Sequence, residues 1–304
     1  MTEWRRTVSA ILDAPGVVVV LGPVDVGKTT VATTLANAAV RAGRRPAIVD
    51  ADTGQSELGP PTTVGLGMVD RAVRRMMEVP LRAAYFAGDT SPRDVHPFVV
   101  EGMVRLVYRA QALGASIVVV DTSGWIEGPA ATAAKVQEVC EAAARHVVVV
   151  QHGDEVEPIL ARLPAGVIVH RLRPDARARR RSSAERRGFR EQQFARYFRN
   201  VRTVTLELGR VRQERTITCA GRRIPAARVT TELPLREVRH RLVGLVDDGG
   251  GLVALGTVVG LRNDGDALDV LAPRRALGGV HTLQWGMLRV SPAGREQRQA
   301  RGAA

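Results

Sequence analysis

Short apolar runs alternate with helix-like segments along the first part of the chain, up to about residue 172. The runs are rich in β-branched residues, and the segments between them, such as 98–113 and 130–144, are amphipathic or rich in alanine. Short strands that are apolar throughout are typical of a parallel sheet with helices on both faces, which binds ligands at the carboxyl ends of its strands. The predicted strands are 17–21, 46–49, 83–87, 117–120, 147–150 and 167–169.

The pattern changes at residue 173. Residues 173–200 are basic, polar and compatible with a helix, whereas apolar and polar residues alternate from residue 201 onward. Alternation of this kind is typical of strands with one solvated face. We therefore predict an α/β domain over 1–200 that includes the basic segment 173–200, a smaller β-rich domain over 201–291, and a disordered tail over 292–304.

The segment directly after the first predicted strand has the pattern of a phosphate-binding loop. Its letters, GPVDVGKTT, match G-x-x-x-x-G-K-[ST] between an apolar strand and an alanine-rich helix-like segment, which argues against a chance glycine turn. Backbone amides of such a loop bind phosphate oxygens, the lysine reaches the outer phosphates and the threonine ligates Mg²⁺. The fold prediction is therefore an α/β P-loop NTPase. The residues expected to hold the nucleotide are Gly22, Pro23, Val24, Asp25, Val26, Gly27, Lys28, Thr29 and Thr30.

Composition supports the role of Lys28. Only Lys28 and Lys135 are lysine among 44 basic residues, which leaves 44 − 2 = 42 arginines. A chain that uses arginine almost everywhere thus keeps lysine in the loop, where a compact point charge fits and a guanidinium fork does not.

The charge balance points to an acidic partner. The formal net charge is +13, which favours nucleic acid first and a membrane surface second, with a coding bias toward arginine as the bland alternative. No apolar run approaches the roughly 18 residues of a membrane helix. Two cysteines indicate neither a disulfide framework nor a metal cluster. We expect a cytoplasmic protein that has no membrane partner.

Two of the predicted strands end in carboxylates. Asp50 and Asp52 follow the second strand, and because they are two residues apart they project to the same side. Asp121 follows the fourth strand, in VVVDTSGW. Phosphoryl transfer needs Mg²⁺ and a carboxylate that orients the attacking hydroxyl. We predict Mg²⁺ ligands among Thr29, Asp50 and Asp121 and an orienting role for Asp52, with a turn or capping role as the alternative for Asp50.

An aromatic residue and several arginines complete the candidate chemistry. Trp125 is either a core residue or a platform on which a base stacks. Arg186 and Arg190 would share one helix face, with Arg181 roughly 140° from Arg186. Such a charge run is usually a solvated face. The specific alternative is that these guanidinium groups close over the nucleotide and meet the transferring phosphoryl group.

Together, and in this order, the motifs resemble those of the polynucleotide 5′-hydroxyl kinases. That family includes the RNA kinase associated with eukaryotic pre-mRNA cleavage and the ribosomal-RNA processing kinases. GPVDVGKTT resembles the family's P-loop, DADTGQ its Walker-B-like motif, TSGW its clasp and RSSAERRGFREQQFARYF its lid, so that the resemblance spans residues 16–200. It implies ATP or GTP as donor, Mg²⁺ as cofactor and a nucleic acid with a 5′-hydroxyl end as acceptor, which is RNA or DNA, with RNA favoured.

The resemblance also implies roles for single positions. Asp52 matches the aspartate that activates the 5′-hydroxyl, and Trp125 matches the clasp tryptophan that stacks on the terminal bases. A nucleotide-dependent switch or scaffold without kinase activity, and a kinase for a small metabolite, are the alternatives, and no particular protein partner is predicted. The implied catalytic residues are Lys28, Asp52, Arg181, Arg186 and Arg190, and the implied substrate-binding residues are Gln55, Thr122, Gly124 and Trp125, with the aromatic pair Tyr197 and Phe198 after the lid arginines.

Overall fold

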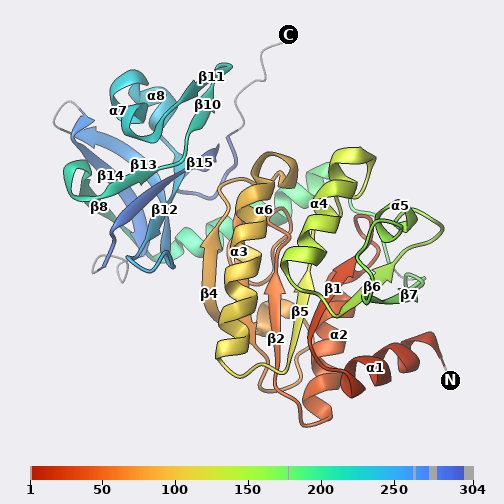
Figure 1. Ribbon diagram of the computed structural model, residues 1–304. Coiled ribbons are helices and arrows are strands. Elements are labelled where there is room, and N and C mark those ends of the chain that lie inside the picture. Colours follow the sequence, from red (N-terminus) through yellow and green to blue (C-terminus); the bar gives the residue numbers. More distant parts are fainter. Residues whose placement is uncertain (1, 177, 263–264, 274–278, 298–304) are drawn as a thin grey trace. The chain divides into compact units, whose positions relative to one another are not determined.

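The computed structural model describes residues 2–176, 178–262, 265–273 and 279–297 (Figure 1). Packing divides these residues into two units, which we describe separately. The first unit comprises residues 2–59, 63–85 and 91–182, and the second comprises 60–62, 86–90 and 183–297. The observed division therefore follows residue 182, whereas the predicted domain boundary followed residue 200.

A seven-stranded sheet forms the centre of the first unit, in the order β4-β3-β2-β5-β1-β6-β7. Strands β2, β5, β1, β6 and β7 pair in parallel, and β3 pairs antiparallel with β2. The predicted α/β P-loop fold with a mostly parallel sheet is thereby confirmed. The strands are β1 (Val17–Leu21), β2 (Pro46–Asp50), β3 (Thr63–Met68), β4 (Leu81–Phe86), β5 (Ile117–Asp121), β6 (His146–Val150) and β7 (Ile168–Leu172).

Helices cover the sheet. Buried residues of α2 pack with one alternating set of strand residues, which includes Val18, Ile48 and Val119. Helix α3 contacts β2, β3 and β5, and Figure 1 shows α3 beside α4 over the sheet. In the central strands β1, β2, β5 and β6 both sets of side chains are thus removed from water, which explains why nearly all their residues are apolar. The helices are α1 (Glu3–Asp13), α2 (Lys28–Arg41), α3 (Pro92–Ala112), α4 (Gly128–Glu141) and the short α5 (Glu157–Leu160), with a 3₁₀ turn η1 (Met76–Glu78).

Strand β3 was missed by the sequence prediction. Its letters, TVGLGM, contain two glycines, and glycine is depleted in strands because it offers no side chain to pack. The fold needs glycine here, since a Cβ atom on Gly65 would lie 1.8 Å from the carbonyl oxygen of Leu58. The loop after β2 therefore lies directly on the backbone of β3.

The second unit contains a six-stranded sheet in the order β8-β14-β13-β12-β15-β9, which confirms the predicted β-rich C-terminal part. Its neighbours pair antiparallel except β9 and β15, which are parallel. A two-stranded hairpin, β10-β11, accompanies the sheet. The elements are α6 (Ser183–Tyr197), η2 (Phe198–Asn200), β8 (Val201–Glu207), η3 (Leu208–Arg210), β9 (Arg212–Glu214), β10 (Ile217–Cys219), β11 (Arg222–Ile224), η4 (Ala226–Arg228), α7 (Val229–Glu232), α8 (Leu235–Val238), β12 (Arg241–Val246), β13 (Leu252–Arg262), β14 (Ala267–Pro273) and β15 (Thr282–Arg289).

Helix α6 belongs to the second unit because its aromatic residues are part of that core. Phe194 and Phe198 are buried with Leu242, Leu255 and Leu288 of the sheet. This packing is the physical reason that the boundary lies before the basic helix rather than after it.

Residues 292–297, predicted to be disordered, are ordered by the same unit. Val290 forms a β-bridge with Glu296, whose buried carboxylate accepts hydrogen bonds from the Arg190 guanidinium. The prediction is therefore wrong for these residues, and 298–304 lie outside the described part of the chain. Within that part, no helix combines the length and the apolar character that crossing a bilayer requires.

Candidate functional site

The phosphate loop begins where β1 ends and closes on the first turn of α2. Gly27 caps α2 with a φ of 92°, a left-handed conformation that favours glycine. The α2 N-terminus consequently points its free N–H groups into the loop, where an anion is stabilised. Lys28 is buried, and its Nζ donates to the carbonyl oxygen of Pro23 at 2.7 Å. The loop thus has the predicted strand–loop–helix context.

Three carboxyl groups act on Lys28 by their charge. Burial lowers the pKa of Lys28, while the charges of Asp121, Asp52 and Asp25 raise it. Asp50 and Asp121 end two adjacent parallel strands and are partners in register. Residues that are far apart in the sequence are therefore brought to one edge of the sheet, as the alternation of strands and helices predicted.

Asp121 is the aspartate that contacts the loop threonine. The hydroxyl of Thr29 donates to Asp121 Oδ2 at 2.6 Å, and the other carboxylate oxygen, Oδ1, is buried with no hydrogen-bond partner among the described residues. Burial raises the pKa of Asp121 to about 7, whereas the Lys28 charge and the Thr29 hydrogen bond lower it. A buried acceptor without a partner, next to a second oxygen donor, suits a hard cation such as Mg²⁺.

Asp50, by contrast, is committed to the loop that follows β2. Its carboxylate accepts hydrogen bonds from the backbone N–H groups of Asp52, Glu57 and Leu58 and from the Ser56 hydroxyl, at 2.8 to 3.1 Å. Burial and the neighbouring Asp121 charge raise its pKa well above the usual range. The geometry disagrees with the prediction of Asp50 as a metal ligand and favours the turn-forming alternative.

Asp52 is only half-buried and holds a tight turn. Its Oδ1 accepts the backbone N–H groups of Gly54 and Gln55, both at 3.1 Å, while Oδ2 has no hydrogen-bond partner among the residues described. Asp50 in turn fixes the backbone of Asp52. The Gln55 side-chain amide donates to the carbonyl of Gly54 at 2.6 Å. The carboxylate of Asp52 is thus oriented by its own loop and keeps one oxygen for another contact.

The TSGW turn, residues 122–125, packs against the phosphate loop. The hydroxyl of Thr122 donates to the carbonyl of Val20 at 2.8 Å, so this side chain links the end of β5 to β1. The geometry disagrees with the prediction that the Thr122 side chain binds a substrate. A Cβ atom on Gly124 would lie 2.6 Å from the backbone nitrogen of Val24, which explains the glycine by close approach. Gly124 therefore allows the turn to lie directly against the backbone of the phosphate loop.

Trp125 occupies the end of this turn and is half-buried. The His96 ring meets it edge to face at a centroid distance of 6.3 Å, and the Arg93 guanidinium lies 5.8 Å from the ring centroid. Its indole Nε1 is buried and lacks a hydrogen-bond partner in the described structure. The tryptophan is therefore held by residues of α3 without being part of the main core.

The three lid arginines have different surroundings. Arg181 donates its backbone N–H and its Nε to the carboxylate of Asp25 in the phosphate loop, at 2.9 and 3.1 Å. Arg190 is buried in the second unit and pairs with Glu296, which disagrees with a catalytic role for this arginine. Arg186 also lies in the second unit, on α6.

The aromatic pair after the lid arginines belongs to the second core. The hydroxyl of Tyr197 accepts the backbone N–H of Leu255 at 2.8 Å, and burial raises the pKa of Tyr197 to about 12. Phe198 is buried beside it. Both rings thus stabilise the unit.

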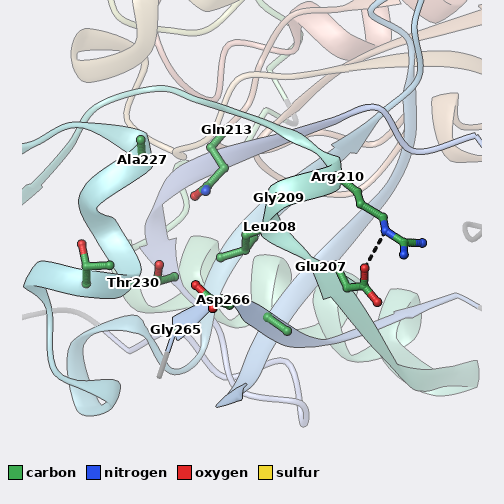
Figure 2. Close-up of a pocket in the computed structure, with 11 residues that line it drawn as sticks. Glu207, Leu208, Gly209, Arg210, Gln213, Ala227, Thr230, Gly265 and Asp266 are labelled. Carbon is green, nitrogen blue, oxygen red and sulfur yellow. Dashed lines mark ion pairs between the residues drawn. The ribbon is translucent and has the colours of Figure 1, made fainter. Parts of the chain in front are cut away.

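The second unit also has a pocket of its own, shown in Figure 2, with a volume of about 530 Å³. Its walls come from the ends of β8 and β14 and from η4 and α7. Arg210 is the one basic residue among the described residues that line it, and it pairs with Glu207 at 2.6 Å. Because this described lining has neither a phosphate loop nor an excess of positive charge, we place the nucleotide site at residues 22–30.

Comparisons with known proteins agree with this geometry. The polyribonucleotide 5′-hydroxyl-kinase of Pyrococcus furiosus is 26% identical over 325 residues, covering 94% of this chain and 90% of that protein. The protein of the same name from Methanocaldococcus jannaschii is 25% identical over 334 residues, covering 96% and 92%. A Clp1p chain solved in complex with Pcf11p superposes with a TM-score of 0.66 at 12% identity, over 93% of this chain and 77% of that chain, which shows a shared fold.

The family comparison covers the whole set of motifs. Residues 22–200, which run from the phosphate loop to the end of η2, match the family described as mRNA cleavage and polyadenylation factor CLP1 P-loop. The match and the loop geometry together identify a nucleotide-binding site in the first unit. The chain therefore belongs to the CLP1 P-loop family.

Proposed function

We propose that this protein is a polynucleotide 5′-hydroxyl kinase that transfers the γ-phosphate of ATP or GTP to the 5′ end of RNA. The observation that carries the proposal is the convergence of Lys28, Thr29, Asp121 and Asp52 at one edge of one sheet. The archaeal relatives that match over most of this chain are named polyribonucleotide 5′-hydroxyl-kinases, which supports RNA as the acceptor.

The donor side of the reaction is assigned to the phosphate loop. The α2 N-terminus and the loop amides bind the phosphates, and Lys28 leaves the Pro23 carbonyl to meet the outer phosphate oxygens. Thr29 and Asp121 would hold Mg²⁺, which supplies neutralisation of phosphate charge. The orphaned Oδ1 of Asp121 fits that assignment, since a cation satisfies it and favours the ionised form.

The acceptor side is assigned to Asp52. Its free Oδ2 accepts the proton of the 5′-hydroxyl while the sugar oxygen forms its bond to the γ-phosphorus. The bond between that phosphorus and the β–γ bridging oxygen breaks, and the nucleoside diphosphate leaves with the electron pair. Because Gly54 and Gln55 fix Oδ1, the carboxylate keeps its orientation during this exchange.

The remaining roles combine the resemblance with the surroundings of each residue. Arg181, which contacts Asp25 of the phosphate loop, stabilises the transferring group, whereas Arg190 orders its own unit. For Arg186, which belongs to the second unit, the same stabilising role is supported by the resemblance alone. Trp125 stacks on the terminal base of the acceptor, while Gln55 lies beside Asp52 as a further substrate contact.

Removal of the Asp52 carboxylate tests the proposal. We expect Asp52→Ala to lower phosphate transfer to a 5′-hydroxyl RNA oligonucleotide by about 10²- to 10⁴-fold, the usual worth of a positioned base, while nucleotide binding survives. The assay uses a labelled γ-phosphate donor, RNA and DNA acceptors, and a 5′-phosphorylated oligonucleotide as blocked control. Asp70→Ala removes an exposed carboxylate of the same unit and serves as matched control.

Two outcomes would contradict the assignment. Full transfer by the Asp52→Ala protein would remove Asp52 from its role. Nucleotide binding without transfer in the wild-type protein, on any acceptor, would instead support the switch or scaffold alternative.

A further inference from the structure

One of the two lysines of the chain is buried beneath the TSGW turn. Lys135, on α4, is 0% exposed, and its Nζ donates to Ser123 Oγ at 3.1 Å and to the two carboxylate oxygens of Glu138 at 2.8 and 3.1 Å. A buried ammonium is costly unless its donors are satisfied, and these three contacts satisfy all three. Ser123 lies in the turn that carries Trp125.

A second route joins the same lysine to Trp125. Glu138 Oε1 lies 3.7 Å from Nδ1 of His96 on α3, and Nε2 of His96 lies 3.3 Å from Gln137 Oε1. The His96 ring in turn meets the Trp125 ring edge to face. Lys135 therefore supports the tryptophan from both sides, through the turn before it and through the ring beside it.

The choice of lysine and its position are both informative. Arginine fills 42 of the 44 basic positions, yet a guanidinium is planar and larger, and it would not place three donors on one hydroxyl and one carboxylate in this space. Burial is the main cause that lowers the pKa of Lys28, and the charge of Lys135 lowers it further, so Lys135 lies near the phosphate loop as well as beneath the turn.

We propose that Lys135 is a positioning residue for the acceptor strand. The network of Lys135, Glu138 and His96 fixes the TSGW turn so that Trp125 presents its ring to the base at the 5′ end. The inference rests on the proposed kinase function, because that function gives Trp125 its stacking role. The inference gives these three buried or half-buried side chains the task of orienting the clasp. None of the three belongs to the sequence motifs.

Steady-state kinetics of a small set of variants test the network. Lys135→Met combined with Glu138→Gln removes the ion pair without leaving an unpaired charge, and His96→Leu and Ser123→Ala each break one connection while keeping the pair. We expect the KM for the oligonucleotide to rise by about tenfold in the double variant, since a base stacked on an aromatic ring is worth a factor of this order. The KM for the nucleotide should change by less than about twofold, because the donor contacts are untouched.

Trp125→Phe is the reference and Glu141→Gln the matched control. Glu141 is an exposed carboxylate at the end of the same helix, so its neutralisation should leave both KM values unchanged. We expect the quenching of tryptophan fluorescence by an added oligonucleotide to fall in the double variant toward the value of Trp125→Phe. If the double variant fails to fold, as circular dichroism would show, the two single variants carry the test.

An unchanged oligonucleotide KM and unchanged quenching in the folded variants would overturn the inference. Failure of the proposed function looks different, because the wild-type protein would then transfer no phosphate. In that case the fluorescence titration still decides whether the network positions Trp125 for a nucleic acid.

Discussion

Asp50 and Asp121 are chemically identical neighbours with different tasks, and the difference comes from what each one contacts. Asp50 accepts four hydrogen bonds from the loop that ends at Leu58, whereas Asp121 accepts one from Thr29 and keeps Oδ1 without a partner in the described structure. A satisfied buried carboxylate stabilises a fold, and an unsatisfied one stores a cost that a ligand can relieve. If Asp121 holds Mg²⁺ as proposed, its role in function opposes its contribution to stability.

Neutralising Asp121 should stabilise the protein that has no bound nucleotide or metal. The pKa of Asp121 is about 7 in the folded protein and near its ordinary low value in the unfolded chain. The folded state thus binds more protons, so this contribution to stability is present at acid pH and is lost as pH rises through about 7. Asparagine does not ionise, so Asp121→Asn should remove that loss. We expect the stability that the variant gains over the wild type to be larger at pH 8 than at pH 5 by on the order of 1–3 kcal/mol, as urea unfolding at the two pH values would measure.

The variant also removes the negative charge that lies next to Asp50, and this loss of repulsion should further stabilise the folded protein. Phosphate transfer should be lost at the same time, because the proposed Mg²⁺ ligand is gone. A variant that is destabilised at pH 8, or that keeps full activity, would argue against an unpaired functional carboxylate at this position.

Single-residue roles were only partly predictable from the sequence, for a physical reason. The phosphate loop is one continuous motif, and its residues could be assigned together. Thr122, Asp50 and Arg190 find their partners in Val20, the loop ending at Leu58, and Glu296, which no local pattern specifies. The sequence analysis assigned no role to Lys135, the second of the two lysines, and only its burial among Ser123 and Glu138 gives the residue one.

At the level of elements, a histidine pair joins β6, β7 and the end of α1. Nε2 of His146 lies 2.7 Å from the carbonyl of Ala14 and must carry a hydrogen, and its Nδ1 lies 3.0 Å from Nε2 of His170. In the neutral form of His146, Nδ1 accepts a hydrogen bond from Nε2 of His170. Burial is the main cause that lowers the pKa of both rings, which favours their neutral forms. The charge of Arg145 lowers the pKa of His146 further, against the Ala14 hydrogen bond, and a proton on His146 would lower the pKa of His170.

Acidification should therefore destabilise the first unit. The folded protein binds fewer protons at these two sites than the unfolded chain, so their contribution is present above about pH 6.5 and is lost as pH falls toward 5. His170→Gln should flatten this dependence, on the order of 1 kcal/mol over that range, because an amide can donate or accept. His152→Gln changes an exposed histidine of the same unit and should leave the wild-type slope, and a wild-type slope in His170→Gln would contradict the role of the pair.

Element boundaries were less predictable than element types. The central parallel strands were recognised because nearly all their residues are apolar, but β3 was missed because it contains glycines, one of which allows a close backbone contact with Leu58. Helix α6 was placed with the first domain because charge dominates its sequence, whereas two buried phenylalanines, Phe194 and Phe198, pack it with the second unit. Long-range packing thus overrode the local pattern at both places.

The ion pair of α6 with the segment after β15 gives a second test at this scale. Glu296→Ala should destabilise the second unit by about 3–5 kcal/mol, because it leaves the buried Arg190 without its partner. Arg190→Met combined with Glu296→Leu should recover most of that loss, and thermal unfolding would measure both. If residues 292–297 were disordered, Glu296→Ala would instead leave the thermal unfolding of the protein unchanged.

At the scale of the whole molecule, the net charge of +13 has two explanations that the fold alone does not separate. It reflects either contacts with an acidic polymer or a general preference for arginine that serves no partner. Several arginines are already committed to carboxylates, such as Arg171 to Glu157 and Arg262 to Asp269. The number of arginines is therefore a poor measure of the charge available to a nucleic acid, and the dependence on salt is a better one.

Oligonucleotide affinity should fall steeply with salt if the charge serves RNA. Each phosphate contact releases counterions from the strand, so about four contacts to a single strand predict a loss of roughly 10- to 100-fold between about 50 and 200 mM salt. A mononucleoside acceptor carries no phosphates and releases no counterions, so its KM should barely change over that range. Parallel titrations of a 5′-hydroxyl RNA and of a nucleoside measure the contrast. Equal, weak salt dependence for both acceptors would favour the small-metabolite alternative and leave the arginines as a bias of composition. A steep fall in affinity with salt for RNA alone would show that the positive charge of the protein contacts the phosphates of the acceptor. Such an acceptor is a polymer, as the proposed role of Asp52 at a 5′-hydroxyl end requires.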